Sequence, residues 1–170
     1  MSAALPEAGA PKLILVVDDI EDNRVLLDRA LRSSGYETAL AASGREALSL
    51  ISRRVPDMVL LDWMMPELSG LETLRAIRQL HPSSRLPVIM CTAVGEEMSV
   101  VTAMSAGAND YMTKPISLPI LRARMAAHLE QSEVIETLGS AKEEAERKLS
   151  EQTRALFDRA SAPGPQRGHG

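Results

Sequence analysis

The sequence predicts an α/β fold in which five parallel strands form one sheet, doubly wound with helices on both faces. Short continuous apolar runs bounded by turn residues are typical of strands that are buried on both faces. These runs alternate five times with helical segments, which favours a parallel sheet. The strand order 2-1-3-4-5 suits a doubly wound sheet of five strands. The expected strands span residues 13–17, 36–42, 58–61, 87–91 and 110–113.

Turn and capping residues separate these strands from the helices. Ser43 is expected to cap the second helix, with Glu46 three residues later as its capping-box partner. Gly107 is expected to adopt the left-handed conformation at the end of the fourth helix. The expected helices begin near Glu21, span residues 45–52, 71–80 and 95–105, and begin again near Leu118.

The composition divides the chain into four parts. Residues 1–11 are small and mostly uncharged, and we expect them to be disordered. Residues 12–130 contain the alternating strands and helices and form one domain of ordinary size. Residues 131–160 are expected to form a helical extension, and the Gly- and Pro-rich residues 161–170 a disordered tail.

The extension carries a modest coiled-coil pattern. Its apolar residues recur at close to heptad spacing, but Lys142 and Gln152 interrupt that spacing. Gly139 weakens the helix by ~1 kcal/mol, so the sequence is compatible with a continuous helix and with one that is broken at Gly139. We expect a coiled coil or a linker, and a homodimer through this helix is one possibility. The apolar residues are Ile135, Leu138, Ala145, Leu149 and Leu156.

Composition and charge argue against several classes of protein. The net charge is −4 with no basic cluster, and only four residues are aromatic, which disfavours a nucleic-acid partner. Cys91 is the only cysteine, which fits a reducing compartment. No apolar run approaches the ~20 residues of a membrane span, and the first residues do not resemble a signal peptide. We therefore expect no membrane partner and a cytoplasmic location.

Polar residues whose side chains can bind a metal or take part in a reaction follow the apolar runs. Asp18 and Asp19 follow the first strand, Asp62 the third, Thr92 the fourth and Lys114 the fifth. Because the carboxyl ends of parallel strands form the site of an open α/β sheet, these five side chains should converge. The repulsion among three carboxylates predicts a bound cation, and magnesium prefers such oxygen ligands. Taken alone, the adjacent pair of aspartates would also suit a solvated N-cap before the first helix.

The same residues resemble the receiver domain of response regulators in two-component signalling, in particular chemotaxis-regulator-like receivers. The matching segments are residues 16–19, 60–66 with Gly70, 91–93 and 106–115. The resemblance covers about residues 12–130 and implies a flavodoxin-like fold. It also implies a bacterial phosphorelay protein that signals by accepting a phosphoryl group rather than by turning over a substrate as an enzyme.

The resemblance assigns roles to the acidic cluster. Asp62 would be the phosphoacceptor and would take its phosphoryl group from a sensor histidine kinase or a histidine phosphotransfer protein. Asp19 would bind magnesium (or manganese) directly, and Asp18 would assist, partly through water. Asp62 and the backbone carbonyl of Met64 would complete the protein ligands. A main-chain ligand explains why a thioether side chain is tolerable at that position.

The resemblance also implies a phosphate-binding switch. Lys114 would pair with Asp62 at rest and with phosphoryl oxygens afterwards, and its peptide bond to Pro115 is typically cis in this family. Thr92 and Ala93 would bind the phosphoryl group and draw the following loop inward.

Two further expectations concern signalling and lifetime. Tyr111 would rotate into the space that Thr92 vacates, although a half-buried strand tyrosine is the plainer interpretation. The apolar side chain of Met64 is expected to slow hydrolysis of the acyl phosphate.

The output of such a switch has several possible forms. Phosphorylation would bias the face made by the fourth helix, the fifth strand and the fifth helix, together with the C-terminal helix. An unknown protein target could read that face, or the chain could be the first part of a longer regulator with a nucleotide cyclase or phosphatase output domain. A haloacid-dehalogenase-like phosphatase is disfavoured because it needs Asp-x-Asp, whereas Asp18 and Asp19 are adjacent. His128 is expected to be a solvated helix residue and not a phosphotransfer histidine.

Overall fold

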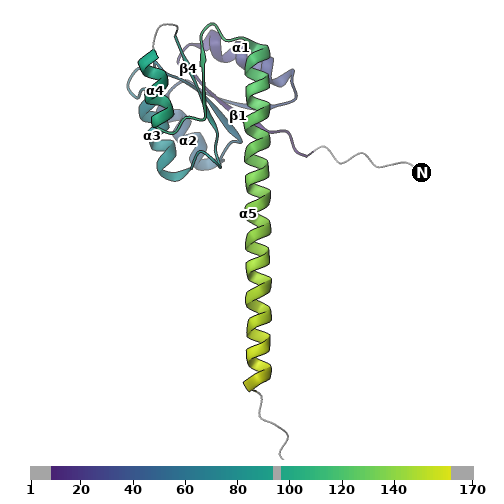
Figure 1. Ribbon diagram of the computed structural model, residues 1–170. Helices are drawn as coiled ribbons and strands as arrows, with labels where there is room; N and C mark the ends of the chain where they lie inside the picture. Colours follow the sequence, from purple (N-terminus) through teal and green to yellow (C-terminus); the bar gives the residue numbers. More distant parts are fainter. Residues whose placement is uncertain (1–8, 94–96, 162–170) are drawn as a thin grey trace, which may run out of the picture. The chain divides into compact units, whose positions relative to one another are not determined.

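The computed structural model describes residues 9–93 and 97–161 (Figure 1). Most of the two segments expected to be disordered, 1–11 and 161–170, lies outside these residues. Part of the loop that follows Ala93 also lies outside them.

Five parallel strands form one sheet in the order β2-β1-β3-β4-β5, which confirms the predicted topology. At the carboxyl edge, Val17 pairs with Ala41 and Leu61, and Asp62 pairs with Cys91. The strands are β1 (Leu13–Val17), β2 (Glu37–Ala41), β3 (Met58–Asp62), β4 (Val88–Thr92) and β5 (Asp110–Thr113). This register brings the ends of β1, β3 and β4 to one edge of the sheet.

Five helices connect and follow the strands, and most of their bounds lie within one or two residues of the expected ones. They are α1 (Glu21–Arg32), α2 (Gly44–Arg53), α3 (Gly70–Leu80), α4 (Glu97–Ser105) and α5 (Leu118–Ser161). Ser43 caps α2 by accepting a hydrogen bond from the Glu46 backbone N–H at 3.1 Å. The Glu46 carboxylate accepts from the Ala42 N–H at 2.7 Å, one residue earlier than in a standard capping box.

The sheet is buried on both faces, as its continuous apolar strands require. Alternate residues of β1 illustrate this: Leu15 and Val17 belong to a core with residues of α2, α3 and α4, whereas Ile14 and Val16 belong to a core with residues of α1 and α5. Leu121, Met125 and Leu129 of α5 belong to this second core. The two cores fix the strands, and therefore the side chains that leave their carboxyl ends.

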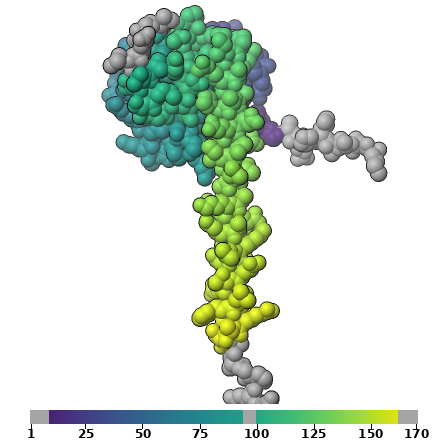
Figure 2. Space-filling view, viewed as in Figure 1, coloured from purple at the N-terminus to yellow at the C-terminus, as the bar shows by residue number. Residues whose placement is uncertain are grey.

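α5 is a single helix of 44 residues that continues through Gly139, so the predicted helical extension is not broken there. The chain divides into two compact units, Met1–Glu133 and Val134–Gly170. The described part of the second unit is entirely helical, and its side chains lie on the surface (Figure 2). None of the described helices combines the length and the hydropathy that a membrane span requires.

Candidate functional site

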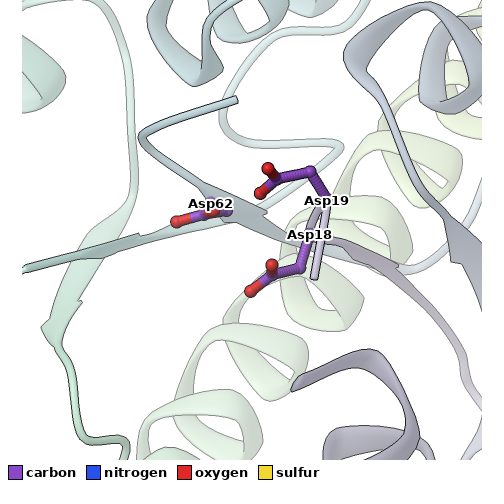
Figure 3. A group of neighbouring side chains, drawn as sticks. All are labelled: Asp18, Asp19 and Asp62. Atoms are coloured by element: carbon purple, nitrogen blue, oxygen red, sulfur yellow. The ribbon is translucent and has the colours of Figure 1, made fainter. Parts of the chain in front are cut away.

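Three carboxylates and one ammonium gather at the carboxyl edge of the sheet. Asp18 and Asp19 follow β1, and Asp62 ends β3 (Figure 3). Lys114 follows β5. One carboxylate oxygen from each of the three aspartates lies within 4.8 Å of the other two. Asp18 and Asp62 are 3% and 6% exposed, whereas Asp19 is open to solvent. The structure therefore brings together four of the residues that the sequence placed at strand ends.

Local hydrogen bonds hold Asp18 in place. Its carboxylate accepts from the Ile20 backbone N–H at 2.9 Å and from the Asn23 side-chain amide at 3.1 Å. Its backbone carbonyl accepts from the Arg24 guanidinium at 2.6 Å. The N-cap residue of α1 is Ile20 and has no side-chain cap, so the alternative interpretation of a solvated aspartate N-cap pair is wrong for Asp18.

Lys114 bridges two carboxylates. Its Nζ lies 3.0 Å from Asp62 Oδ1 and 3.0 Å from Asp18 Oδ2, so the resting ammonium pairs with both and not with Asp62 alone. Its backbone N–H donates to the Thr92 carbonyl at 2.7 Å, which ties the end of β5 to the end of β4. The Lys114–Pro115 peptide bond is cis.

For both Asp62 and Lys114, the effect of burial on the pKa is opposed by the contact between the two side chains. Burial raises the pKa of the Asp62 carboxyl, and the neighbouring Asp18 and Asp19 raise it further, against the hydrogen bond from Lys114. Burial alone would lower the pKa of Lys114, but its bonds to Asp62 and Asp18 outweigh that effect and the pKa is raised. Three carboxylates and one ammonium leave a formal charge of −2, which a divalent cation would balance.

Thr92 and Tyr111 occupy neighbouring strands near the site. Thr92 is the last residue of β4 and is 3% exposed, and its hydroxyl donates to the Ala93 carbonyl at 3.4 Å. Tyr111 lies in β5 and is 36% exposed. A buried hydroxyl at the strand end and a surface tyrosine on the next strand are therefore in place.

A close approach between β3 and α3 shapes the other side of the site. A Cβ on Gly70 would lie 2.1 Å from the Asp62 carbonyl oxygen, so only glycine fits there. The Gly70 N–H donates to the Trp63 carbonyl at 2.9 Å, which closes the loop between them. Met64 lies in this loop, two residues after Asp62, with a side chain that is 64% exposed.

His128 differs from the expectation. Its Nε2 lies 3.0 Å from Asp110 Oδ2, and both side chains are only 19% exposed, so the prediction of a solvated helix residue is wrong. Arg124 binds the other oxygen of the same carboxylate. Because Asp110 begins β5, these contacts fasten α5 to the strand that precedes Lys114. The i, i+4 spacing of the two basic residues was the available sequence signal.

The fold and the acidic cluster are those of a receiver domain, and the comparisons agree. Residues 14–126 match the response regulator receiver domain family, and the chain belongs to that family.

The most similar relatives include regulators of bacterial transcription. The chain is 44% identical over 127 residues to the phosphate regulon transcriptional regulatory protein PhoB of Rhizobium meliloti (strain 1021), covering 74% of this chain and 56% of that protein. It is 42% identical over 123 residues to the alkaline phosphatase synthesis transcriptional regulatory protein PhoP of Bacillus subtilis (strain 168), covering 72% and 50%. The chain thus spans about half the length of the curated relatives it matches.

Solved structures show the same fold. A putative response regulator from Chloroflexus aurantiacus J-10-fl is 36% identical with a TM-score of 0.67, covering 71% of this chain and 98% of that chain. NtrX from Brucella abortus is 34% identical with a TM-score of 0.71, covering 76% of this chain but 29% of that one.

Proposed function

We propose that this receiver domain is a phosphorylation-dependent switch in which Asp62 accepts a phosphoryl group from a phosphohistidine. The donor would be a sensor histidine kinase or a histidine phosphotransfer protein. The observation that carries the proposal is the position of Asp62. It is a buried carboxylate at the end of β3, 3.0 Å from the Lys114 ammonium and within 4.8 Å of two further carboxylates.

The arrangement suits phosphoryl transfer, which asks mainly for positioning and charge neutralisation. An oxygen of Asp62 attacks the phosphorus, the bond from phosphorus to the histidine nitrogen breaks, and that nitrogen keeps the electron pair. Lys114 holds the carboxylate before transfer, and its remaining N–H donors can then bind phosphoryl oxygens. The Thr92 hydroxyl and Ala93 provide further contacts to the phosphoryl group.

A divalent cation fits the same cluster. Three carboxylates, with one oxygen from each within 4.8 Å of the others, offer the hard ligands that magnesium or manganese prefers. Asp18, Asp19, Asp62 and the Met64 carbonyl would hold it. When bound, the ion supplies positive charge to the oxygens of the transferring group.

The output would leave through α4, β5 and α5. Val101, Met104 and Tyr111 on this face are 66%, 45% and 36% exposed, which suits a protein partner. We propose a cytoplasmic signalling role for this chain, without enzymatic turnover or nucleic-acid contact of its own. The greater length of the relatives supports the alternative that such a domain regulates an attached output domain, for which a nucleotide cyclase or a phosphatase is a candidate.

Phosphorylation with a small acyl phosphate tests the proposal directly. We expect intact-protein mass spectrometry to show one added phosphoryl group that depends on magnesium and is removed by hydroxylamine. Asp62→Asn should remove the signal while leaving the far-ultraviolet circular dichroism unchanged. A label that persists in this variant, or that maps to His81 or His128, would contradict the assignment.

A further inference from the structure

The described part of the second unit, residues 134–161, carries an exposed apolar stripe along one side of its helix. Within residues 134–161, apolar and small side chains recur with a repeat of 11 residues. The stripe consists of Val134, Leu138, Ala141, Ala145, Leu149, Gln152, Leu156 and Ala160. Gln152 is its only polar member.

The 11-residue repeat keeps this stripe on one side of the helix. Eleven residues make three turns at 3.67 residues per turn, close to the 3.6 of a straight α-helix. At ~100° per residue, all eight positions fall within an arc of about 100°. Lys142, which interrupts the heptad expected from the sequence, falls at the edge of this stripe. The stripe is therefore continuous over ~40 Å of helix.

Large apolar side chains of the stripe are open to solvent. Val134 is 52% exposed, Leu138 and Leu149 are each 64% exposed, and Leu156 is 66% exposed. An otherwise largely polar helix with one such stripe is typical of a helix that pairs with another. Together these observations indicate a partner with a matching apolar stripe.

We propose that the partner is a second copy of this chain, packed in a parallel and in-register two-stranded coiled coil along the stripe. This interface does not depend on the phosphoacceptor role of Asp62. Residues 134–160 carry this interface whether or not Asp62 accepts a phosphoryl group, although phosphorylation can change its affinity.

The charges beside the stripe favour this partner and this direction. Lys142 and Glu146 flank one side of the stripe, and Glu144 and Lys148 flank the other. Within one helix each flank is an i, i+4 ion pair. The Lys142–Glu146 distance is 3.9 Å, and the Lys148–Glu144 distance is 2.7 Å.

Direction decides which flanks meet. In a parallel, in-register pair, one flank faces the opposite flank of the second copy, so that each lysine meets a glutamate two residues away in height. An antiparallel pair with full overlap would instead set Glu146 beside Glu146 and Lys148 beside Lys148 of the second copy. Exposed ion pairs add little affinity, but flanking charges do select orientation.

The repeat continues only in part into the first unit, because Glu130 stands 11 residues before Ala141. Ala123 and Ala127 stand 11 residues before Val134 and Leu138, and both are exposed. The proposed interface is thus continuous in sequence with the surface of α5 in the receiver domain.

Sedimentation equilibrium of the full chain tests the interface. We expect the double variant Leu138→Glu with Leu149→Glu to raise the dimer dissociation constant at least ~100-fold, because it would bury charge in an apolar seam. Phe157→Glu is the matched control, since Phe157 is equally apolar and 71% exposed but lies outside the stripe. A wild-type chain that stays monomeric at high concentration, or a dimer lost in the control and kept in the double variant, overturns the proposal.

Cysteine crosslinking tests the register without relying on a disruptive variant. Ala141→Cys and Gln152→Cys, introduced singly, should each form a disulfide between two copies, because equivalent positions meet in a parallel pair. Ser140→Cys and Glu151→Cys, one residue earlier, should not. Crosslinking at neither stripe position would exclude the parallel pair, because in an antiparallel pair with full overlap Ala141 meets Thr153 and Gln152 meets Lys142 of the second copy. Equal crosslinking at the controls would exclude the stripe as the interface.

Discussion

At the scale of single residues, the site is set by one contact between side chains and one close approach between backbone segments. Lys114 reaches Asp18 across 96 residues of sequence, and Gly70 lets the first turn of α3 touch the end of β3. Both contacts act on Asp62, one through its carboxylate and the other through its carbonyl. The position of the proposed phosphoacceptor therefore depends on residues with little reactivity of their own.

Gly70→Ala tests the close approach. The added Cβ would lie 2.1 Å from the Asp62 carbonyl oxygen and 2.9 Å from the Trp63 Cα, both backbone atoms that cannot rotate away. We expect a loss of about 2 kcal/mol or more in the free energy of unfolding in urea, together with slower phosphorylation of Asp62. Gly9→Ala is the control, because its Cβ would meet nothing within 4 Å. Equal urea midpoints for the two variants would disprove the steric argument.

Cys91 should be inert in the folded protein. It is 3% exposed, and burial raises the pKa of its thiol to about 12. Relative to a free cysteine of pKa about 8.5, its thiolate fraction at neutral pH is lower by more than ~1000-fold. We expect a thiol reagent to modify the native wild type far more slowly than Ser140→Cys, and to modify Cys91 at an ordinary rate in guanidinium. Rapid labelling of native wild type would show that β4 opens readily.

At the scale of elements, the apolar strand runs and their alternation with helices determined the topology and placed Asp18, Asp19, Asp62 and Lys114 at one edge of the sheet. What the sequence could not predict was which side chains of different elements contact one another. Whether the ammonium contacts one carboxylate or two depends on side-chain paths across three strands. The burial of His128 against Asp110 likewise depends on how α5 lies on β5.

A second pairing between elements joins α1 to β2 and gives a pH-dependent prediction. The Thr38 hydroxyl donates to the Asp28 carboxylate, and this bond, followed by the bond from Arg32, lowers the pKa of Asp28. A lowered folded pKa stabilises the protein above the unfolded value of about 3.9, and that contribution is lost as the pH falls through the folded pKa. We expect Asp28→Asn to reduce stability by ~1 kcal/mol at pH 7.

Measuring the effect of Asp28→Asn at several pH values tests whether the charged carboxylate is responsible. The difference between wild type and Asp28→Asn in urea unfolding should shrink as the pH falls below 4. A double-mutant cycle with Thr38→Val should show that the two losses are not additive. A difference that is constant with pH, or additive losses, would mean that the carboxylate contributes through something other than this bond.

At the scale of the whole molecule, one helix links the switch to the proposed interface. Leu121, Met125 and Leu129 of α5 pack in the same core as Met112 of β5, the strand that also carries Tyr111 and leads to Lys114. The same helix carries the apolar stripe from Val134 onward. A change in how β5 and α5 pack can therefore alter the affinity between two copies, provided that the phosphorylated state and the dimer favour the same packing.

Linkage makes this measurable. If phosphorylation tightens the dimer, dimer formation must favour the phosphorylated state by the same factor. With magnesium and beryllofluoride, which stands in for the phosphoryl group on Asp62, we expect the dimer dissociation constant from sedimentation to fall at least ~5-fold, the lower end of typical coupling energies. Asp62→Ala should abolish the response. Leu138→Glu with Leu149→Glu should bind beryllofluoride and remain monomeric, which separates the switch from the interface. An affinity that is unchanged by beryllofluoride in the wild type would mean that the helix is a constitutive dimer element. The signal would then leave through the exposed side chains of α4 and β5 to a separate protein.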